Sequence, residues 1–270
     1  MNLAAAQVVA QDAAPERWAV FLHGLLGRGS NWQGFARKLV QARPEWGALL
    51  LDLRMHGDSQ SLEPPHTLAS AARDVRAALA AAPGPARAVI GHSFGGKVAL
   101  LLSADPPPEL EQIWVLDASP SARHARDERD TLERVLSALL EMPQRFASRN
   151  EFTAELARRG VDEALGRWLA KNLVRESDGL RFALALGAMR ELLSDYDQTD
   201  LWPLLEAPPP GIAVRVVVGG RSRTIEPAGR ARLQAAAAAG AIELLELPEA
   251  GHWLHTDDPD GLLDLLVTRL

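Results

Sequence analysis

The residues best suited to chemistry lie in the pentapeptide GHSFG at positions 91–95, where Ser93 stands between two glycines. Apolar residues at 88–90 predict a buried strand before it, and residues 97–102 predict a helix after it. A sharp strand-to-helix turn presents a serine hydroxyl on a strained backbone, and flanking glycines are needed because side chains there would collide. Ser93 is therefore predicted to be a nucleophile.

A serine hydroxyl needs a base to become nucleophilic at neutral pH. Of the seven histidines, His252 follows the last predicted strand, which brings it to the carboxyl edge of the sheet, where open α/β sheets bind ligands. We predict His252 as the base. His255 is the rival and is otherwise interpreted as an exposed residue at the start of the final helix. His92 is interpreted as a packed neighbour of the nucleophile.

Two carboxylates are candidates for the acid that orients the histidine. Asp117 ends the apolar run at 113–116, and a carboxylate at the carboxyl end of a strand can reach an imidazole at the same sheet edge. Glu226 is the alternative. A capping role with Ser119 in the following turn would also account for Asp117. We expect Asp117 to be the acid.

Acyl transfer also needs N–H donors for the negative charge that develops on the carbonyl oxygen. HGLLG at 23–27 follows the first long strand, and the amides of Leu25 and Phe94 are the predicted donors. We interpret His23 as a hydrogen-bonding scaffold residue. The segment DLRMHGDS at 52–59 lacks further ligands at a recognisable metal spacing, so it is interpreted as a turn-stabilising polar cluster and no metal is predicted.

Alternating strands and helices must position these residues. Short runs rich in Val, Ile and Leu predict strands buried on both faces at 18–22, 48–53, 86–90, 113–116, 212–218 and 242–247. Segments with helical spacing lie between them, and Asp258 before Pro259 predicts the start of the last helix. The predicted fold class is α/β, with a doubly wound, mostly parallel sheet.

The alternation stops between residues 121 and 207, where apolar positions keep helical spacing without an intervening strand. We predict that residues 121–207 form an all-helical insertion, the cap, over a core built from residues 1–120 and 208–270. Large apolar side chains of the cap are the candidates for substrate-binding walls, although each is individually explained as cap core: Phe146, Trp168, Phe182, Met189 and Trp202.

Composition argues against several function classes. The formal net charge of −6 gives no basic field, so neither nucleic acid nor an anionic membrane is an expected partner. The absence of cysteine removes disulfides, thiolate catalysis and cysteine-ligated metals. The first residues lack the basic start of a secretory signal, and no segment offers the roughly 18 apolar residues of a membrane span, so a cytoplasmic protein is expected. The oligomeric state stays open.

Together the motifs resemble the α/β-hydrolase superfamily, and within it the cofactor-free esterase and thioesterase branch with a helical cap. The counterparts here are HGLLG at 23–27, MHGDS at 55–59, GHSFGGK at 91–97, WVLDASP at 114–120 and GHW at 251–253. Met55 and Phe94 depart from the residues usual in this branch. The loop GGRSRT at 219–224 lacks the late carboxylate found in most proteins of this fold, which leaves the identity of the acid as the open point.

The resemblance implies hydrolysis of a small carboxylic ester or acyl thioester through an acyl-enzyme, without a cofactor. Ser93, His252 and Asp117 would form the triad. The alternative is a lyase resembling the menaquinone-pathway enzyme that uses the same triad as a base, but Lys97 and the segment LDASP at 116–120 favour the hydrolase. A third hypothesis is a protein that senses a small ligand and retains the triad without turnover.

Overall fold

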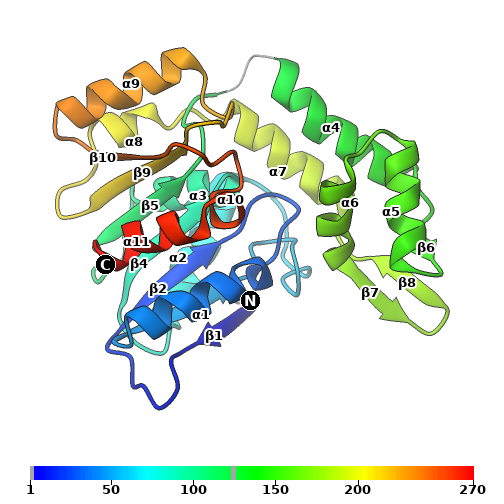
Figure 1. Ribbon diagram of the computed structural model, residues 1–270, viewed down its shortest axis with the longest axis horizontal. Coiled ribbons are helices and arrows are strands. Elements are labelled where there is room, and N and C mark those ends of the chain that lie inside the picture. The colour runs from blue at the N-terminus through cyan, green and yellow to red at the C-terminus, as the bar shows by residue number, and fades with distance from the viewer. Residues whose placement is uncertain (1–2, 123–125) are drawn as a thin grey trace.

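The computed structural model describes the backbone of residues 3–122 and 126–270 and the side chains of residues 3–122 and 132–270. Its central sheet has seven strands: β1 (Ala5–Val8), β2 (Arg17–Leu22), β3 (Trp46–Leu51), β4 (Ala86–His92), β5 (Gln112–Leu116), β9 (Ala213–Gly219) and β10 (Glu243–Leu247). Their order in the sheet is β1-β3-β2-β4-β5-β9-β10 (Figure 1). β1 runs antiparallel to β3, and the other neighbouring strands are parallel. The prediction of an α/β fold with a mostly parallel sheet is confirmed.

Helices cover both faces of this sheet (Figure 1). One face carries α1 (Gln33–Ala42) and α11 (Pro259–Val267), and the other carries α2 (Leu68–Ala80), α3 (Phe94–Leu102) and α9 (Pro227–Ala238). All six residues of β3 are buried, which explains its continuous apolar sequence. α11 begins as predicted, with Pro259 in its first turn and the Asp258 carboxylate accepting a hydrogen bond from the Gly261 amide at 2.9 Å.

The cap contains strands as well as helices, so the prediction of an all-helical insertion is wrong. Its helical segments are α4 (Arg126–Glu141), α5 (Arg149–Arg158), α6 (Glu163–Leu169), the 3-10 helix η2 (Ala170–Asn172), α7 (Leu186–Gln198) and α8 (Trp202–Glu206). A second sheet, with strand order β6-β8-β7, is formed by β6 (Arg145–Phe146), β7 (Leu173–Glu176) and β8 (Gly179–Phe182). Both neighbouring pairs in this small sheet are antiparallel.

The hairpin of β7 and β8 has a local cause in the sequence. Buried and less buried residues alternate along β8, with Leu180 and Phe182 buried, as a two-residue period requires. The connection is the pair Ser177 and Asp178, followed by Gly179 at φ +143°. Short turns of this kind favour aspartate and glycine. Helical spacing from Phe182 to the apolar positions of α7 concealed this alternation.

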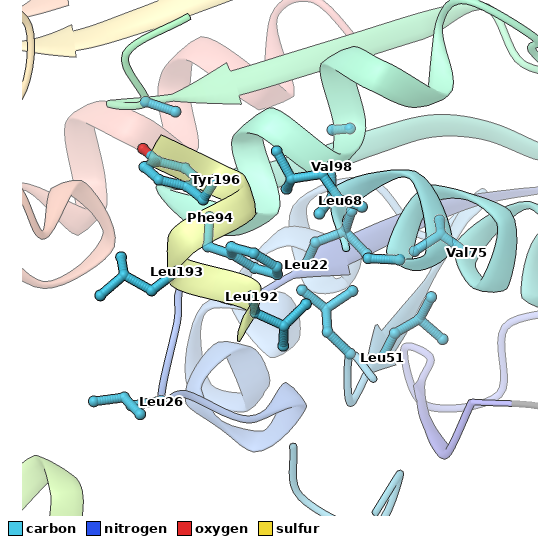
Figure 2. Packing of buried hydrophobic residues seen from close by; sticks show 14 of the residues in the cluster. Leu22, Leu26, Leu51, Leu68, Val75, Phe94, Val98, Leu192, Leu193 and Tyr196 are labelled. Carbon is cyan, nitrogen blue, oxygen red and sulfur yellow. The ribbon is translucent and has the colours of Figure 1, made fainter. Parts of the chain in front are cut away.

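Cap and core share one hydrophobic cluster. Figure 2 shows Leu192, Leu193 and Tyr196 of α7 beside Phe94 at the start of α3. The rings of Phe94 and Tyr196 have centroids 6.0 Å apart. The helix that follows the predicted nucleophile is therefore packed directly against the cap.

Lys97 of α3 forms hydrogen bonds with the backbone near both ends of the cap. Its buried ammonium donates hydrogen bonds to the carbonyl oxygens of Ser121 at 2.8 Å, Tyr196 at 2.7 Å and Thr199 at 2.7 Å. The ammonium also lies 4.3 Å from the centroid of the Tyr196 ring. Hydrogen bonds from a charged donor are stronger than neutral ones, so this single side chain joins the start of the cap to the end of α7.

No helix within the described residues 3–122 and 126–270 is both long and apolar enough to cross a membrane.

Candidate active site

Ser93 occupies the turn between β4 and α3, with φ +53° and ψ −115°. Its amide donates to the carbonyl oxygen of Leu116 at 2.9 Å, which ties the turn to the neighbouring strand. A Cβ on Gly91 would overlap the backbone of Gly95, and a Cβ on Gly95 would lie 2.7 Å from the carbonyl oxygen of His23. Such a backbone conformation costs about 1–3 kcal/mol for a non-glycine residue, so the close packing around the turn must maintain it.

Asp117 and His252, the predicted acid and base, meet at the carboxyl edge of the sheet. His252 lies in the loop after β10 and Asp117 follows β5; the His252 Nδ1 atom is 2.7 Å from the Asp117 Oδ2 atom. Asp117 is completely buried, with φ +44°, and its Oδ1 atom accepts a hydrogen bond from the Gly219 amide at 3.1 Å. Glu226 lies instead at the start of α9. A carboxylate only accepts, so the His252 proton lies on Nδ1 and Nε2 is left as an acceptor.

His92 joins the turn of Ser93 to the loop of His252. Its Nε2 atom donates to the carbonyl oxygen of His252 at 2.7 Å, and the two rings have centroids 4.7 Å apart. Burial, reinforced by the neighbouring His252, lowers the pKa of His92 well below 6.5. The side chain is neutral at pH 7 and positions the two loops relative to each other.

His255 is half-buried rather than exposed as expected from the sequence. Its ring lies 4.3 Å from that of Trp32, centroid to centroid. Burial lowers its pKa to about 4, and nearby His252 and Lys171 act in the same direction. Within the described residues its Nδ1 atom has no hydrogen-bond partner, whereas His252 contacts a carboxylate. Of the two histidines, His252 therefore has the geometry of a base.

The loop at 24–27, which carries one predicted oxyanion donor, passes beside Ser93. A Cβ on Gly24 would lie 3.5 Å from the Ser93 Cβ atom. The Gly24 carbonyl oxygen accepts from the Gly27 amide at 3.0 Å and from the Nδ1 atom of His23 at 2.8 Å. Because a trans peptide is planar, the N–H of Leu25 points away from that carbonyl. Among the described residues none accepts a hydrogen bond from the Leu25 amide. The Phe94 amide begins α3, where N–H groups have no acceptor within the helix.

Two neutral histidines, His23 and His56, hold this loop by hydrogen bonds. His23 accepts a hydrogen bond at Nε2 from the Leu53 amide at 3.0 Å, and His56 accepts one at Nε2 from the Leu26 amide at 3.0 Å. Leu26 has φ +63°, a conformation that needs such support. Burial lowers the pKa of His23 to about 4 and that of His56 to about 3. Both imidazoles thus keep an acceptor nitrogen at neutral pH, which agrees with their interpretation as scaffold residues.

The five large cap residues named from the sequence occupy different places. Trp168 contacts the loop of His252, since its ring centroid lies 4.9 Å from that of Trp253. Phe146 and Phe182 pack around Phe152 inside the cap, with centroid distances of 5.1 and 5.4 Å. Met189 is completely buried in α7. Trp202 donates from Nε1 to the Ser121 hydroxyl at 2.8 Å, at the base of the cap.

Three polar side chains near these loops were not predicted from the sequence. Asn172 of η2 is buried, and its side-chain amide donates to the Leu26 carbonyl oxygen at 2.8 Å. Ser222 donates to the Asp117 Oδ2 atom at 2.5 Å, and the Thr224 hydroxyl lies 2.8 Å from the Nδ1 atom of His252. For the last two, the signal in the sequence is the loop at 219–224 itself, which carries two hydroxyl side chains where a carboxylate is usual.

A comparison with protein families decides the classification. A family model described as the alpha/beta hydrolase family matches residues 19–265 of the chain. The chain belongs to this family. The position of Ser93 between a parallel strand and a helix is therefore the one in which members of the alpha/beta hydrolase family carry their nucleophile.

Curated proteins and solved structures similar to this alpha/beta hydrolase cover nearly its whole length. The sn-1-specific diacylglycerol lipase ABHD11 of Mus musculus is 27% identical over 254 residues, which cover 93% of this chain and 80% of that protein. Esterase YbfF of Escherichia coli (strain K12) is 26% identical over 247 residues, 90% of this chain and 89% of that protein. A solved structure titled "Marine microorganism esterase" has a TM-score of 0.84 and 23% identity, covering 100% of this chain and 99% of that one, and it shows the same fold.

Proposed function

We propose that the protein is a serine hydrolase that cleaves a carboxylic ester or an acyl thioester through an acyl-enzyme on Ser93. The observation that carries the proposal is the 2.7 Å contact between His252 Nδ1 and the buried Asp117 carboxylate, at the same sheet edge as the strained turn of Ser93. The protein is an ester hydrolase, the class to which the lipase and the esterase among its relatives also belong.

The first half of the proposed reaction forms the acyl-enzyme. The Ser93 Oγ atom attacks the carbonyl carbon while its proton passes to the Nε2 atom of His252. Asp117 stabilises the imidazolium, and the amides of Leu25 and Phe94 donate to the negative oxygen of the tetrahedral intermediate. The intermediate collapses, the bond to the leaving group breaks, and the imidazolium returns its proton to the leaving alkoxide or thiolate.

The second half releases the acid. Water donates a proton to the Nε2 atom of His252 and attacks the acyl carbonyl carbon, forming a second tetrahedral intermediate at the same amide donors. Its collapse returns the proton to the Ser93 oxygen and frees the carboxylic acid. In this scheme the cap, and Trp168 against Trp253 in particular, limits the space for the acyl group. The cytoplasmic location stays a prediction.

The proposal is tested by hydrolysis of p-nitrophenyl esters and acyl thioesters of increasing chain length, with Ser93→Ala as the comparison. We expect turnover by the parent protein and a loss of at least about 10³-fold in kcat for the variant, since removing the nucleophile of a triad has effects of this size or larger. Intact-mass spectrometry should also detect one covalent adduct with a fluorophosphonate in the parent and none in Ser93→Ala.

Three outcomes would contradict the proposal. Equal turnover in the parent and in Ser93→Ala would show that Ser93 is not the nucleophile. Turnover of a substrate by elimination, without any acyl-enzyme in a rapid-quench experiment, would assign the same residues to a lyase. Tight binding of a small ligand without turnover would instead support a sensing protein.

A further inference from the structure

The loop at 219–224 lies between β9 and α9 and contacts both Asp117 and the loop that carries His252. The Gly220 amide donates to the carbonyl oxygen of Leu247 and the Arg221 amide to that of Ala250, each at 2.9 Å. A Cβ on Gly219 would overlap the backbone of Gly251. This loop therefore lies against the segment that carries His252 so closely that a glycine is required.

The same loop is fixed from its other side by α9. One guanidinium nitrogen of Arg230 donates to the carbonyl oxygen of Gly219 at 2.6 Å and to that of Ser222 at 3.1 Å. The Ser222 amide donates to the Gly219 carbonyl oxygen at 3.1 Å and closes a turn. Main-chain contacts and Arg230 thus order much of the backbone that presents the Ser222 and Thr224 side chains.

Two hydroxyls from this loop reach the atoms through which acid and base interact. Ser222 Oγ lies 2.5 Å from Asp117 Oδ2, the oxygen that is also 2.7 Å from His252 Nδ1. Thr224 Oγ1 lies 2.8 Å from the same nitrogen. The two hydroxyl oxygens are 3.1 Å apart, and the Thr224 amide donates to Ser222 Oγ at 3.1 Å.

The direction of each hydrogen bond follows from the number of protons. Asp117 only accepts, so Ser222 gives its single proton to Oδ2. The contact between the hydroxyls is then made by the Thr224 proton, which is donated to Ser222 Oγ. The proton on His252 Nδ1 faces two acceptors, Asp117 Oδ2 and Thr224 Oγ1. The four side chains form a closed ring of hydrogen bonds.

We infer that Ser222 and Thr224 are positioning residues for the Asp117–His252 pair, and that their hydroxyls occupy the place of the carboxylate which this loop lacks. The inference rests on the proposed function. Thr224 gives the imidazolium of His252 a second hydrogen-bond acceptor. Ser222 donates to the Asp117 carboxylate and so weakens the interaction of its negative charge with the imidazolium. The two hydroxyls therefore act on the protonation of His252 in opposite directions, because a hydrogen bond to a charged group is stronger than one to a neutral group.

Other titratable groups that face His252 in the described part of the chain are His92 at the end of β4 and His255 in α10. Burial lowers the pKa of His92 well below 6.5 and that of His255 to about 4, so both are neutral at pH 7. Asp117 is the carboxylate in contact with the ring. A shift of the acid limb of the activity profile near neutral pH would therefore report on the ring of hydrogen bonds.

The test measures kcat and KM against pH for four variants, with an ester that the parent protein hydrolyses. Thr224→Val keeps the shape of the side chain and removes the hydroxyl, and Thr224→Ser keeps the hydroxyl. Ser222→Ala removes the other hydroxyl. The matched control is Thr268→Val, an exposed threonine whose hydroxyl donates to the Asp264 carbonyl oxygen at the end of α11.

We expect Thr224→Val to lower kcat about tenfold with little change in KM, as the loss of one hydrogen bond to a charged group implies. The pH of half-maximal activity on the acid side should fall in Thr224→Val and rise in Ser222→Ala. Thr224→Ser and Thr268→Val should match the parent.

Shifts of the same sign in Thr224→Val and Ser222→Ala would overturn the inference. So would equal impairment in Thr224→Val and Thr224→Ser, or parent-like behaviour in all four variants. These outcomes differ from a failure of the proposed function, which would show as no turnover in the parent or as turnover that survives Ser93→Ala.

Discussion

Two loops at the carboxyl edge of the sheet are ordered by different chemistry. The loop at 24–27 is fixed by uncharged groups, the imidazoles of His23 and His56 and the amide of Asn172. The loop at 219–224 is built around a carboxylate, Asp117, and two hydroxyls. In the proposed mechanism, the first arrangement fixes the direction of a backbone donor and stays neutral through the catalytic cycle. The second must respond when the imidazole of His252 gains and loses a proton.

This comparison explains why each loop has its residues. A donor that waits for a developing negative charge performs best when it is already oriented, so rigid neutral partners suit the loop at 24–27. A base needs a partner that favours its protonated form, so a buried carboxylate suits the other loop. Disruption of the two loops should therefore have distinct kinetic and pH signatures.

The largest effect is expected from Asp117, the carboxylate around which the loop at 219–224 is built. Asp117→Asn keeps the size of the side chain but offers a neutral amide to His252 Nδ1, which favours the wrong tautomer and removes the stabilisation of the imidazolium. We expect kcat to fall about 10⁴-fold, as for the equivalent change in other triads. Steady-state kinetics on the preferred ester will measure it. Glu226→Gln at the start of α9 is the matched control and should keep parental kcat; the reverse ranking would move the acid to Glu226.

A smaller effect is expected from Asn172, one of the neutral groups that fix the loop at 24–27. Asn172→Leu removes the donor to the Leu26 carbonyl oxygen and leaves that oxygen buried without a partner. This loss is worth about 1–3 kcal/mol and weakens the support of a strained turn, so kcat should fall about tenfold while KM changes little. A boronic acid that mimics the tetrahedral intermediate should bind more weakly by a similar factor.

Asn150→Leu on the exposed side of α5 provides the control for the change of side-chain type. It should leave both kcat and boronate affinity unchanged. Parental kcat in Asn172→Leu would show that the cap does not contribute to the order of the loop at 24–27.

The last prediction concerns stability rather than activity, and it distinguishes the imidazoles whose pKa burial lowers from the carboxylates. His23, His56 and His255 have an unfolded-state pKa near 6.5, but in the folded chain burial lowers these values to about 4, about 3 and about 4. Below pH 6.5 the unfolded state therefore binds more protons than the folded state. The contribution of these histidines to the free energy of unfolding should be fully present above pH 6.5. It should fall as the pH is lowered toward 4, by an amount on the order of 3 kcal/mol for His23 alone at pH 4.

Urea unfolding at pH 7, 6 and 5 measures this slope above the range in which most carboxylates titrate. His255→Phe retains a ring against Trp32 and should reduce the slope by about one proton. A free energy of unfolding that is constant or rises on acidification would show that these histidines are not buried as neutral groups.

The sequence was sufficient to predict six of the seven strands of the sheet, all but the antiparallel edge strand β1, and the place of the main candidates. Buried parallel strands are continuous apolar runs, and a Gly-x-Ser-x-Gly turn after such a run has few alternative structures. Because carboxyl ends of parallel strands meet at one edge, Asp117 and His252 could be placed together although 134 residues lie between them in the chain.

The missed features depend on contacts that no local pattern encodes. Phe182 fits helical spacing with Leu186 and Met189 as well as strand alternation with Leu180. Packing within the cap decides that it lies in a strand. Asn172, Ser222 and Thr224 are ordinary polar residues in sequence, and their importance comes from partners distant in the chain. His255 was expected at the surface because the cover provided by Trp32 and His92 is tertiary.

The hydrogen bonds of Lys97 have a consequence for how such enzymes diversify. One ammonium on α3 grips the main-chain oxygens of Ser121 and Thr199, where the polypeptide leaves the sheet and where it returns from α7. Backbone oxygens are present whatever the side chains, so these two hydrogen bonds do not depend on the side chains at Ser121 and Thr199. A foreign lid grafted between Ser121 and Thr199 would therefore meet the same buried cation at both of its ends.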